Sequence, residues 1–156
     1  MGSSSKLLDR TFERWVDNKD PVRARIEIFE KIRDIPYAIV TELIGDKRYI
    51  DILKVGRGSC TPKHLLLAEM YQRLGLPGLF VVYPFSWGER NVFTEEYPAK
   101  LKNLAIAQPP GYHLSCKIEI EGRLVTVDAT LDPPLAKSGC LPVNLSWDGL
   151  SDTILQ

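Results

Sequence analysis

The sequence has few cysteines and no excess of charge, and both features exclude broad classes of protein. Its three cysteines cannot build the paired disulfide framework of small secreted domains, so we expect a reducing, cytoplasmic compartment. Twenty basic residues balance twenty acidic ones, which gives no reason to expect nucleic acid or an anionic membrane as a partner. Long apolar runs are also missing, so we expect no membrane-spanning segment.

The rest of the composition is that of one globular domain. The chain has 156 residues, 44% of them apolar and 26% charged, which is enough for a hydrophobic core without disulfides. Residues 1–6 are rich in glycine and serine and are followed by no signal-peptide core, so we interpret them as a disordered end or a cloning remnant. Residues 7–156 then form a single domain.

The chain is organised around residues 55–77, where a loop broken by glycines leads into an amphipathic helix. Gly56 and Gly58 precede Cys60, and Pro62 fits only the first turn of a helix. The apolar residues that recur with helical spacing before a glycine ends the helix are Leu66, Leu67, Met70, Tyr71 and Leu74. Cys60 therefore lies at or next to the helix N-terminus, where free N–H groups favour a thiolate.

Only two histidines could serve this thiol as a base, and one of them lies in a predicted β-hairpin. Residues 112–130 form two alternating strands joined by a tight turn at Glu121-Gly122. In that register His113 and Asp128 share a face as diagonal neighbours, within reach of each other. A thiol, an imidazole and a carboxylate in this order predict nucleophilic catalysis, with the N–H of the cysteine helping to bind an oxyanion.

His64 lies one helical turn beyond Cys60 and supports two other interpretations. It could form a dyad with Cys60, or both could bind zinc together with His113 and Cys116. On an alternating strand His113 and Cys116 point to opposite faces and cannot bind one ion, so we expect no metal. Cys116 is a poor resolving partner for a redox-sensing thiol for the same reason. We expect His64 to flank the site.

Each candidate also has a purely structural explanation. Most free cysteines are small buried hydrophobic residues, and a histidine on a strand is usually a satisfied core or surface residue. Asp128 could simply cap a turn. Only the combination of the three residues favours a catalytic site.

The segments before the cysteine loop are best explained as scaffold. Residues 7–18 and 21–35 are two predicted helices, the second beginning at an Asp-Pro pair. The apolar positions expected to form the buried stripe of the second helix are Val22, Ile26, Phe29 and Ile32. Within residues 35–54, Gly45-Asp46 predicts a turn, and residues 49–53 predict either a short strand or an approach to the cysteine loop.

The segments after the central helix are a strand and a long loop. Residues 79–83 predict a strand that ends at Pro84. Residues 86–110 predict an irregular excursion, with helical periodicity only over 99–106, whose aromatic residues Trp87 and Tyr97 would line a cleft or join the core. Consecutive prolines after the hairpin predict its end and a loop-like tail.

The sequence resembles the transglutaminase-like superfamily, thiol enzymes related to papain-like folds. The matching motifs are Gly58-Ser59-Cys60, Arg73-Leu74-Gly75-Leu76-Pro77, the hairpin from His113 to Thr130, and the upstream stretch Ile32–Tyr37. The resemblance implies an α+β fold, in which a central helix with the cysteine at its N-terminus packs on a small antiparallel β-sheet. The N-terminal helices then serve as scaffold. The nucleophile, base and acidic partner of the family fall on Cys60, His113 and Asp128.

The resemblance also implies a reaction class. The chain is expected to be a thiol-dependent hydrolase or acyltransferase that acts on a peptide, protein or small amide through a thioester, without a cofactor. Two motifs depart from the family: Thr61-Pro62 follows the cysteine and Leu114-Ser115 follows the histidine, where aromatic or charged residues are usual. These departures support the alternative of a catalytically inactive module that binds or scaffolds.

Overall fold

The structure is a computed structural model, and it describes residues 3–43, 45, 48–86 and 98–156. The helices are α1 (Ser3–Val16), α2 (Pro21–Arg33), α3 (Ile52–Val55), α4 (Cys60–Arg73), α5 (Ala99–Ile106) and α6 (Pro133–Ser138), with 3-10 helices η1 (Thr41–Leu43) and η2 (Arg48–Asp51) before α3. The strands β1 (Gly78–Phe85), β2 (Gly111–Ile120) and β3 (Arg123–Val127) form an antiparallel sheet in the order β1-β2-β3. The fold class is α+β, as the sequence predicts.

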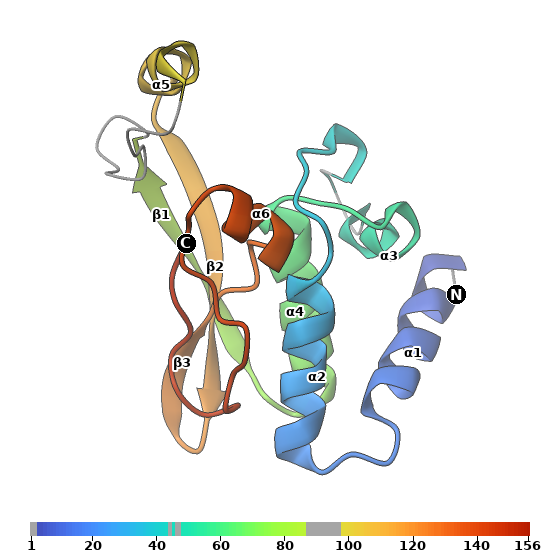
Figure 1. The fold of residues 1–156 in the computed structure, drawn as a ribbon. Coiled ribbons are helices and arrows are strands. Elements are labelled where there is room, and N and C mark those ends of the chain that lie inside the picture. The colour runs from blue at the N-terminus through green and yellow to red at the C-terminus, as the bar shows by residue number, and fades with distance from the viewer. Residues whose placement is uncertain (1–2, 44, 46–47, 87–97) are drawn as a thin grey trace.

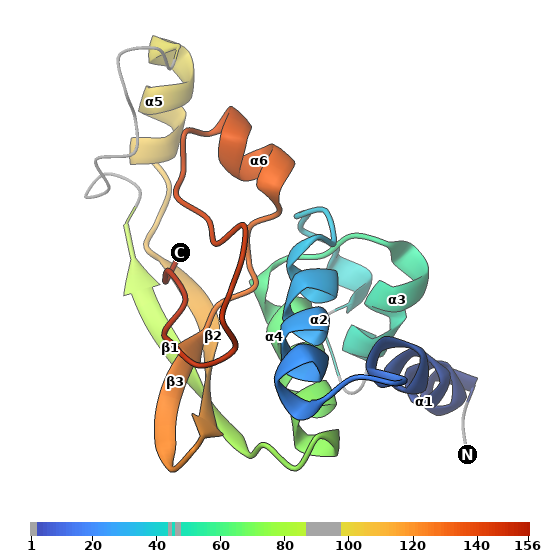
Figure 2. The same cartoon turned by 60° about the horizontal axis from the view of Figure 1, so that its bottom comes forward.

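Helix α4 lies at the centre of the molecule, with the sheet on one side and α2 on the other (Figure 1). Helix α1 packs beside α2, and the second view shows the same order of layers (Figure 2). The core between the layers includes the fully buried side chains of Ile28, Phe29, Leu66, Met70, Tyr71, Ile118 and Val127. Burial of each large apolar side chain contributes roughly 1.5–3 kcal/mol. This packing fixes α4 against β2.

Helix α2 begins where the sequence predicts. The carboxylate of Asp20 accepts hydrogen bonds from the N–H groups of Val22 and Arg23, both at 2.9 Å, and Pro21 is the first helical residue. The predicted buried stripe is partly wrong, because Val22 is 36% exposed whereas Ile28 is fully buried. Since α2 is covered by both α1 and α4, its buried face is wider than a single stripe.

Three other segments differ in part from the sequence prediction. Helix α1 begins at Ser3, earlier than the predicted start at residue 7. Residues 49–53 lie in η2 and the start of α3, so they form an approach to the cysteine loop and not a strand. Helix α5 coincides with the predicted helical part of the excursion, whereas Trp87 and Tyr97 lie outside the described residues.

The hairpin has the predicted register. Cys116 pairs with Val127, and the turn residues Glu121 and Gly122 have φ angles of 53° and 77°, as a two-residue hairpin turn requires. The sequence predicted that Asp128 lies within the second strand of the hairpin. Strand β3 ends at Val127, however, so Asp128 directly follows the strand. The consecutive prolines, which were expected to end the hairpin, lie beyond the end of β3 and begin α6, a helix that the sequence did not predict.

Strand β1 runs through Pro84 to Phe85 and does not end at the proline as predicted. The N–H of Glu119 donates to the carbonyl of Pro77, so odd-numbered residues of β2 form hydrogen bonds with β1. Tyr112, which pairs with Pro84, is even-numbered, so the proline nitrogen faces away from β2. In the described part of the chain β1 is an edge strand, where a missing N–H costs no ladder bond.

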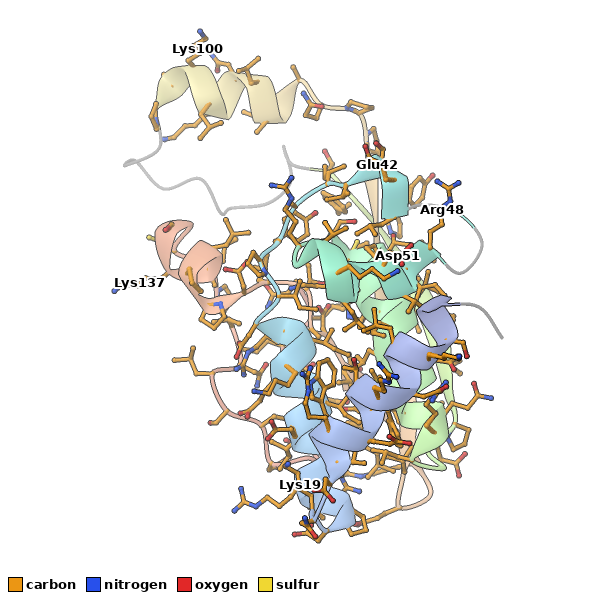
Figure 3. The ribbon with its side chains drawn as sticks, turned by 90° about the vertical axis from the view of Figure 1, so that its right-hand side faces the viewer. Lys19, Glu42, Arg48, Asp51, Lys100 and Lys137 are labelled. Atoms are coloured by element: carbon orange, nitrogen blue, oxygen red, sulfur yellow. The ribbon has the colours of Figure 1, made fainter. Side chains whose placement is uncertain are left out.

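Helix α5 lies at one end of the molecule, away from α1 and α2, with Lys100 pointing outward (Figure 3). None of its side chains is buried. Among the described residues, no helix combines the length and the apolar character needed to cross a bilayer.

Candidate active site

Cys60 is the first residue of α4, and backbone hydrogen bonds hold the loop that precedes it. The N–H of Gly58 donates to the carbonyl of Pro36 at 3.0 Å, and the N–H of Ala38 donates to the carbonyl of Gly58 at 3.2 Å. A Cβ atom at position 58 would lie 2.5 Å from Cδ1 of Ile52, so the close approach of the loop requires glycine. The thiol of Cys60 is half-buried at this helix N-terminus.

His113 on β2 and Asp128 after β3 make the contact that the predicted register implies. His113 Nε2 lies 2.6 Å from Asp128 Oδ2, and both side chains are buried. Asp128 Oδ1 accepts a hydrogen bond from the N–H of Thr130 at 3.0 Å, and Oδ2 accepts one from the N–H of Gln156 at 3.2 Å. The N–H of Asp128 itself donates to Thr153 Oγ1 at 2.7 Å. The C-terminal segment therefore helps to hold this carboxylate.

The thiol of Cys60 completes the arrangement. The ring of His113 and the backbone N–H of Leu114 both stabilise its thiolate and lower its pKa. Because Nε2 of His113 faces Asp128, the other ring nitrogen, Nδ1, faces the thiol. Leu114 belongs to the part of β2 that extends beyond its pairing with β3, which leaves its N–H available to the sulfur. This donor could not be found from the sequence because it depends on where β3 ends.

The electrostatics of the site favour a thiolate beside an imidazolium. Burial opposes a charged thiol, but hydrogen bonds from His113 and Leu114 and the charge of His113 outweigh it, so the pKa of Cys60 lies below its ordinary value. Burial also lowers the pKa of His113, but hydrogen bonds with Asp128 and Cys60 raise it to about 9. At neutral pH the ring of His113 is therefore protonated.

Asp128 supplies the negative charge that holds this proton. Burial alone would raise its pKa, but the hydrogen bond from His113 and the charges of His64 and His113 lower the pKa to about 2. The carboxylate is therefore ionised at neutral pH and stabilises the imidazolium.

Two tyrosines that the sequence analysis did not identify flank the site. The ring of Tyr83 stacks on that of His113, with centroids 6.4 Å apart and planes inclined by 28°. Burial, and the negative charge of a Cys60 thiolate, raise the pKa of Tyr37. Both tyrosines are half-buried, and Tyr83 presents its ring to the site. Tyr83 lies opposite His113 through the pairing of β1 with β2, which the sequence alone does not reveal.

The remaining candidates lie outside the thiol–imidazole–carboxylate site. Cys116 is fully buried, its Sγ donates to the carbonyl of His64 at 3.4 Å, and burial raises its pKa to about 12. Cys140 is exposed, and all three cysteines are free. His64 is fully buried behind the site. In the part of the chain that the structure describes, no three His, Cys, Asp or Glu side chains are grouped to hold a metal ion.

A helix that presents a thiol at its N-terminus, packed on a small antiparallel sheet that presents an imidazole, defines the transglutaminase-like fold, and this chain has that fold. A candidate cysteine protease from Cytophaga hutchinsonii superposes with a TM-score of 0.51 and 15% identity, over 87% of this chain and 40% of that chain. A TGase superposes with a TM-score of 0.56 and 12% identity, over 94% of this chain and 36% of that chain.

This chain therefore spans well under half the length of either protein. The sequence matches no protein-family model and no curated protein. At such low identities the likeness shows the fold, and the chemistry must be argued from the site itself.

Proposed function

We propose that the chain is a thiol-dependent amide acyl hydrolase or acyltransferase. Cys60 is the nucleophile, His113 the general base and acid, and Asp128 the carboxylate that orients and charges His113. The observation that carries the proposal is the 2.6 Å contact of His113 with Asp128, next to a thiol whose pKa His113 lowers. Such a pair of charged groups is suited to attack on an acyl carbon. The descriptions of the two similar structures agree with this reaction class.

The proposed reaction has two halves. The Cys60 thiolate attacks the amide carbon, and the N–H of Cys60 helps to bind the oxyanion of the tetrahedral intermediate. His113 then donates its Nδ1 proton to the leaving amine, the C–N bond breaks, and a thioester remains on Cys60. Water or an amine attacks the thioester while His113 removes its proton, and the acyl product leaves with the thiolate restored. These steps need no cofactor.

The proposed substrate is a peptide, a protein or a small amide. Tyr37 and Tyr83 would form the aromatic walls beside its acyl group. Hydrolysis and transfer differ in which acceptor reaches the thioester, so both remain within the proposal. The three free cysteines support a reducing, cytoplasmic compartment. The balanced charge gives no support for nucleic acid or a membrane as a partner.

The first test is the pH dependence of alkylation at each cysteine, read by mass spectrometry in the wild-type protein and in His113→Ala. We expect Cys60 to react with an apparent pKa well below the reference of about 8.5, because His113 stabilises its thiolate. His113→Ala should return the apparent pKa of Cys60 towards the reference value. Cys140, which is exposed, serves as the internal reference thiol, and buried Cys116 should not react in the folded protein.

A Cys60 that titrates as an ordinary thiol and is unaffected by His113→Ala would contradict the proposal. The chain would then be better explained as a binding or scaffold module that has the fold without the reaction. A poised thiol would instead justify screening amides, with water and amines compared as acceptors.

A further inference from the structure

The second histidine, His64, has a defined place that the proposed reaction does not use. Its ring is fully buried, with Nδ1 2.9 Å from the backbone oxygen of Cys60 and Nε2 3.0 Å from the backbone nitrogen of Ala129. A carbonyl can only accept a hydrogen bond and a backbone amide can only donate one. Nδ1 therefore carries the ring proton, and Nε2 accepts through its lone pair. The neutral ring satisfies both partners at once.

These two hydrogen bonds join the segments that carry the site. Cys60 begins α4, and Ala129 directly follows Asp128 after β3. His64 Nε2 also lies 3.6 Å from Asp128 Oδ1, and its ring meets that of His113 edge to face with centroids 6.0 Å apart. His64 thus contacts the backbone of Cys60, the backbone of Ala129 beside Asp128, and the ring of His113.

We propose that His64 is a positioning residue, whose neutral ring ties the first turn of α4 to the backbone after Asp128 and so sets the distance between thiol and carboxylate. The inference rests on the proposed function only for the catalytic meaning of that distance. His113 can bridge Cys60 and Asp128 only while the two segments stay in register. A side chain bonded to both backbones maintains this register without touching the substrate.

The surroundings of the ring keep it in this form. Burial lowers the pKa of His64 to about 4, with Asp128 raising it and His113 and Lys63 lowering it. A protonated ring could not accept a hydrogen bond from Ala129. Because both nitrogens are already engaged, His64 cannot also remove a proton from Cys60, which argues against the Cys60–His64 dyad.

Three substitutions separate the two hydrogen bonds. His64→Asn places an amide N–H near the Nδ1 position and can retain the bond to Cys60. His64→Gln places an amide oxygen near the Nε2 position and can retain the bond to Ala129. His64→Leu removes both. Leu66→Val, at a fully buried position on the same helix, is the control for lost stability alone.

The readout is the rate of Cys60 alkylation at pH 6.5, measured below the unfolding transition of each variant. We expect His64→Leu to react about tenfold more slowly, because the thiolate of Cys60 loses stabilisation by His113 and its pKa rises when the two segments move apart. Each amide variant keeps one bond and should lose less, about threefold. Leu66→Val should react as the wild type does. Nitrogen NMR of the wild type should show a neutral Nδ1–H ring for His64 from pH 5.5 to 8.

A folded His64→Leu variant with the wild-type thiol pKa would overturn the positioning role. So would a thiolate that is lost in the His64 variants but persists in His113→Ala, since His64 would then be the base. Failure of the proposed function gives a different result, an ordinary thiol pKa in both the wild type and His113→Ala. In that case the NMR tautomer still decides whether His64 ties the two segments together.

Discussion

Asp128 is the residue on which the contacts of the site converge. Its carboxylate accepts hydrogen bonds from the ring of His113 and from the N–H groups of Thr130 and Gln156. Nε2 of His64 lies 3.6 Å from it. The three donors come from segments that are far apart in the sequence. A carboxylate with so many donors is strongly favoured in its ionised form, and its charge is what keeps His113 protonated.

Replacing this charge should uncouple the site without a change of shape. In Asp128→Asn the amide cannot stabilise the imidazolium, so the pKa of His113 should fall towards its ordinary value and that of Cys60 should rise. We expect Cys60 alkylation near neutral pH to slow by about tenfold or more. The measurement is the pH profile of alkylation, with circular dichroism to show that the variant is folded.

Asp152→Asn is the matched control for this substitution. Asp152 accepts a hydrogen bond from the N–H of Thr126 at 2.6 Å and is exposed, so its carboxylate helps to dock the C-terminal segment without contacting His113. The pH profile of Cys60 alkylation in Asp152→Asn should match that of the wild type. Equal reactivity of Asp128→Asn and the wild type at every pH would show that His113 does not depend on this carboxylate.

Among the elements, the loop before α4 places the thiol through a close steric fit. A Cβ atom at position 58 would lie 2.5 Å from Ile52 Cδ1 and 3.1 Å from Pro62 Cγ. Gly58→Ala should therefore displace the loop, destabilise the fold by about 1–3 kcal/mol and slow the reaction of Cys60. Thermal unfolding and alkylation rates measure the two effects.

A second substitution tests the assigned cause. Ile52→Val removes Cδ1, the atom in closest contact, so the double variant Gly58→Ala/Ile52→Val should recover much of both losses. Gly56→Asn is the control, because a Cβ there meets nothing within 4 Å and asparagine tolerates its φ of 70°. Additive losses in the double variant would mean that crowding by Ile52 is not the reason for the glycine.

The elements also show where sequence patterns succeed and where they are insufficient. An Asp-Pro pair correctly predicts the start of α2, and the same pair at Asp132-Pro133 begins α6, where the sequence analysis predicted only the end of a hairpin. Asp132 Oδ1 accepts a hydrogen bond from the N–H of Leu135 at 3.0 Å, as an N-cap does. The capping signal was present, but a helix as short as α6 has no periodicity to support it.

For the whole molecule, the two histidines couple stability to pH in opposite directions. His64 has a folded pKa of about 4, below its ordinary 6.5, so its contribution is present above pH 6.5 and is lost as the pH falls towards 4. His113 has a folded pKa of about 9, so its contribution is present below pH 6.5 and is lost as the pH rises towards 9.

These opposite contributions predict that the stability of the wild type and that of His64→Gln change differently with pH. From pH 7 to pH 5, His64 should destabilise the wild type by about 2 kcal/mol and His113 should stabilise it by about 1 kcal/mol. The lowered pKa of Cys60 also makes stability fall as the pH falls, and it does so in both proteins, so the comparison is made between the two. Because glutamine does not titrate, we expect the wild type to lose about 2 kcal/mol more than His64→Gln over this range. Urea unfolding at the two pH values measures both. Asp128 and Lys63, with pKa values of about 2 and about 8, contribute little over this range.

Only the change with pH is compared, because His64→Gln should be less stable than the wild type at both values. A pH dependence that is the same in both proteins would show that His64 is not held neutral by the fold.

Local periodicity in the sequence was sufficient to predict part of the site. Side chains alternate along a strand, so a two-residue turn at Glu121-Gly122 was enough to bring His113 beside Asp128. Helical spacing and a proline in the first turn placed Cys60 at the start of a helix. These arguments hold because both patterns are set by neighbouring residues.

The meeting of the two halves of the site depends instead on tertiary packing. Two contacts require α4 to pack at one particular position along β2: that of Cys60 with His113 and Leu114, and that of His64 with Ala129. This position is set by buried side chains from several layers and by the end of β3, and no local sequence pattern encodes it. For this reason the sequence could place His64 one helical turn from Cys60, whereas its hydrogen bond with Ala129 could not be predicted.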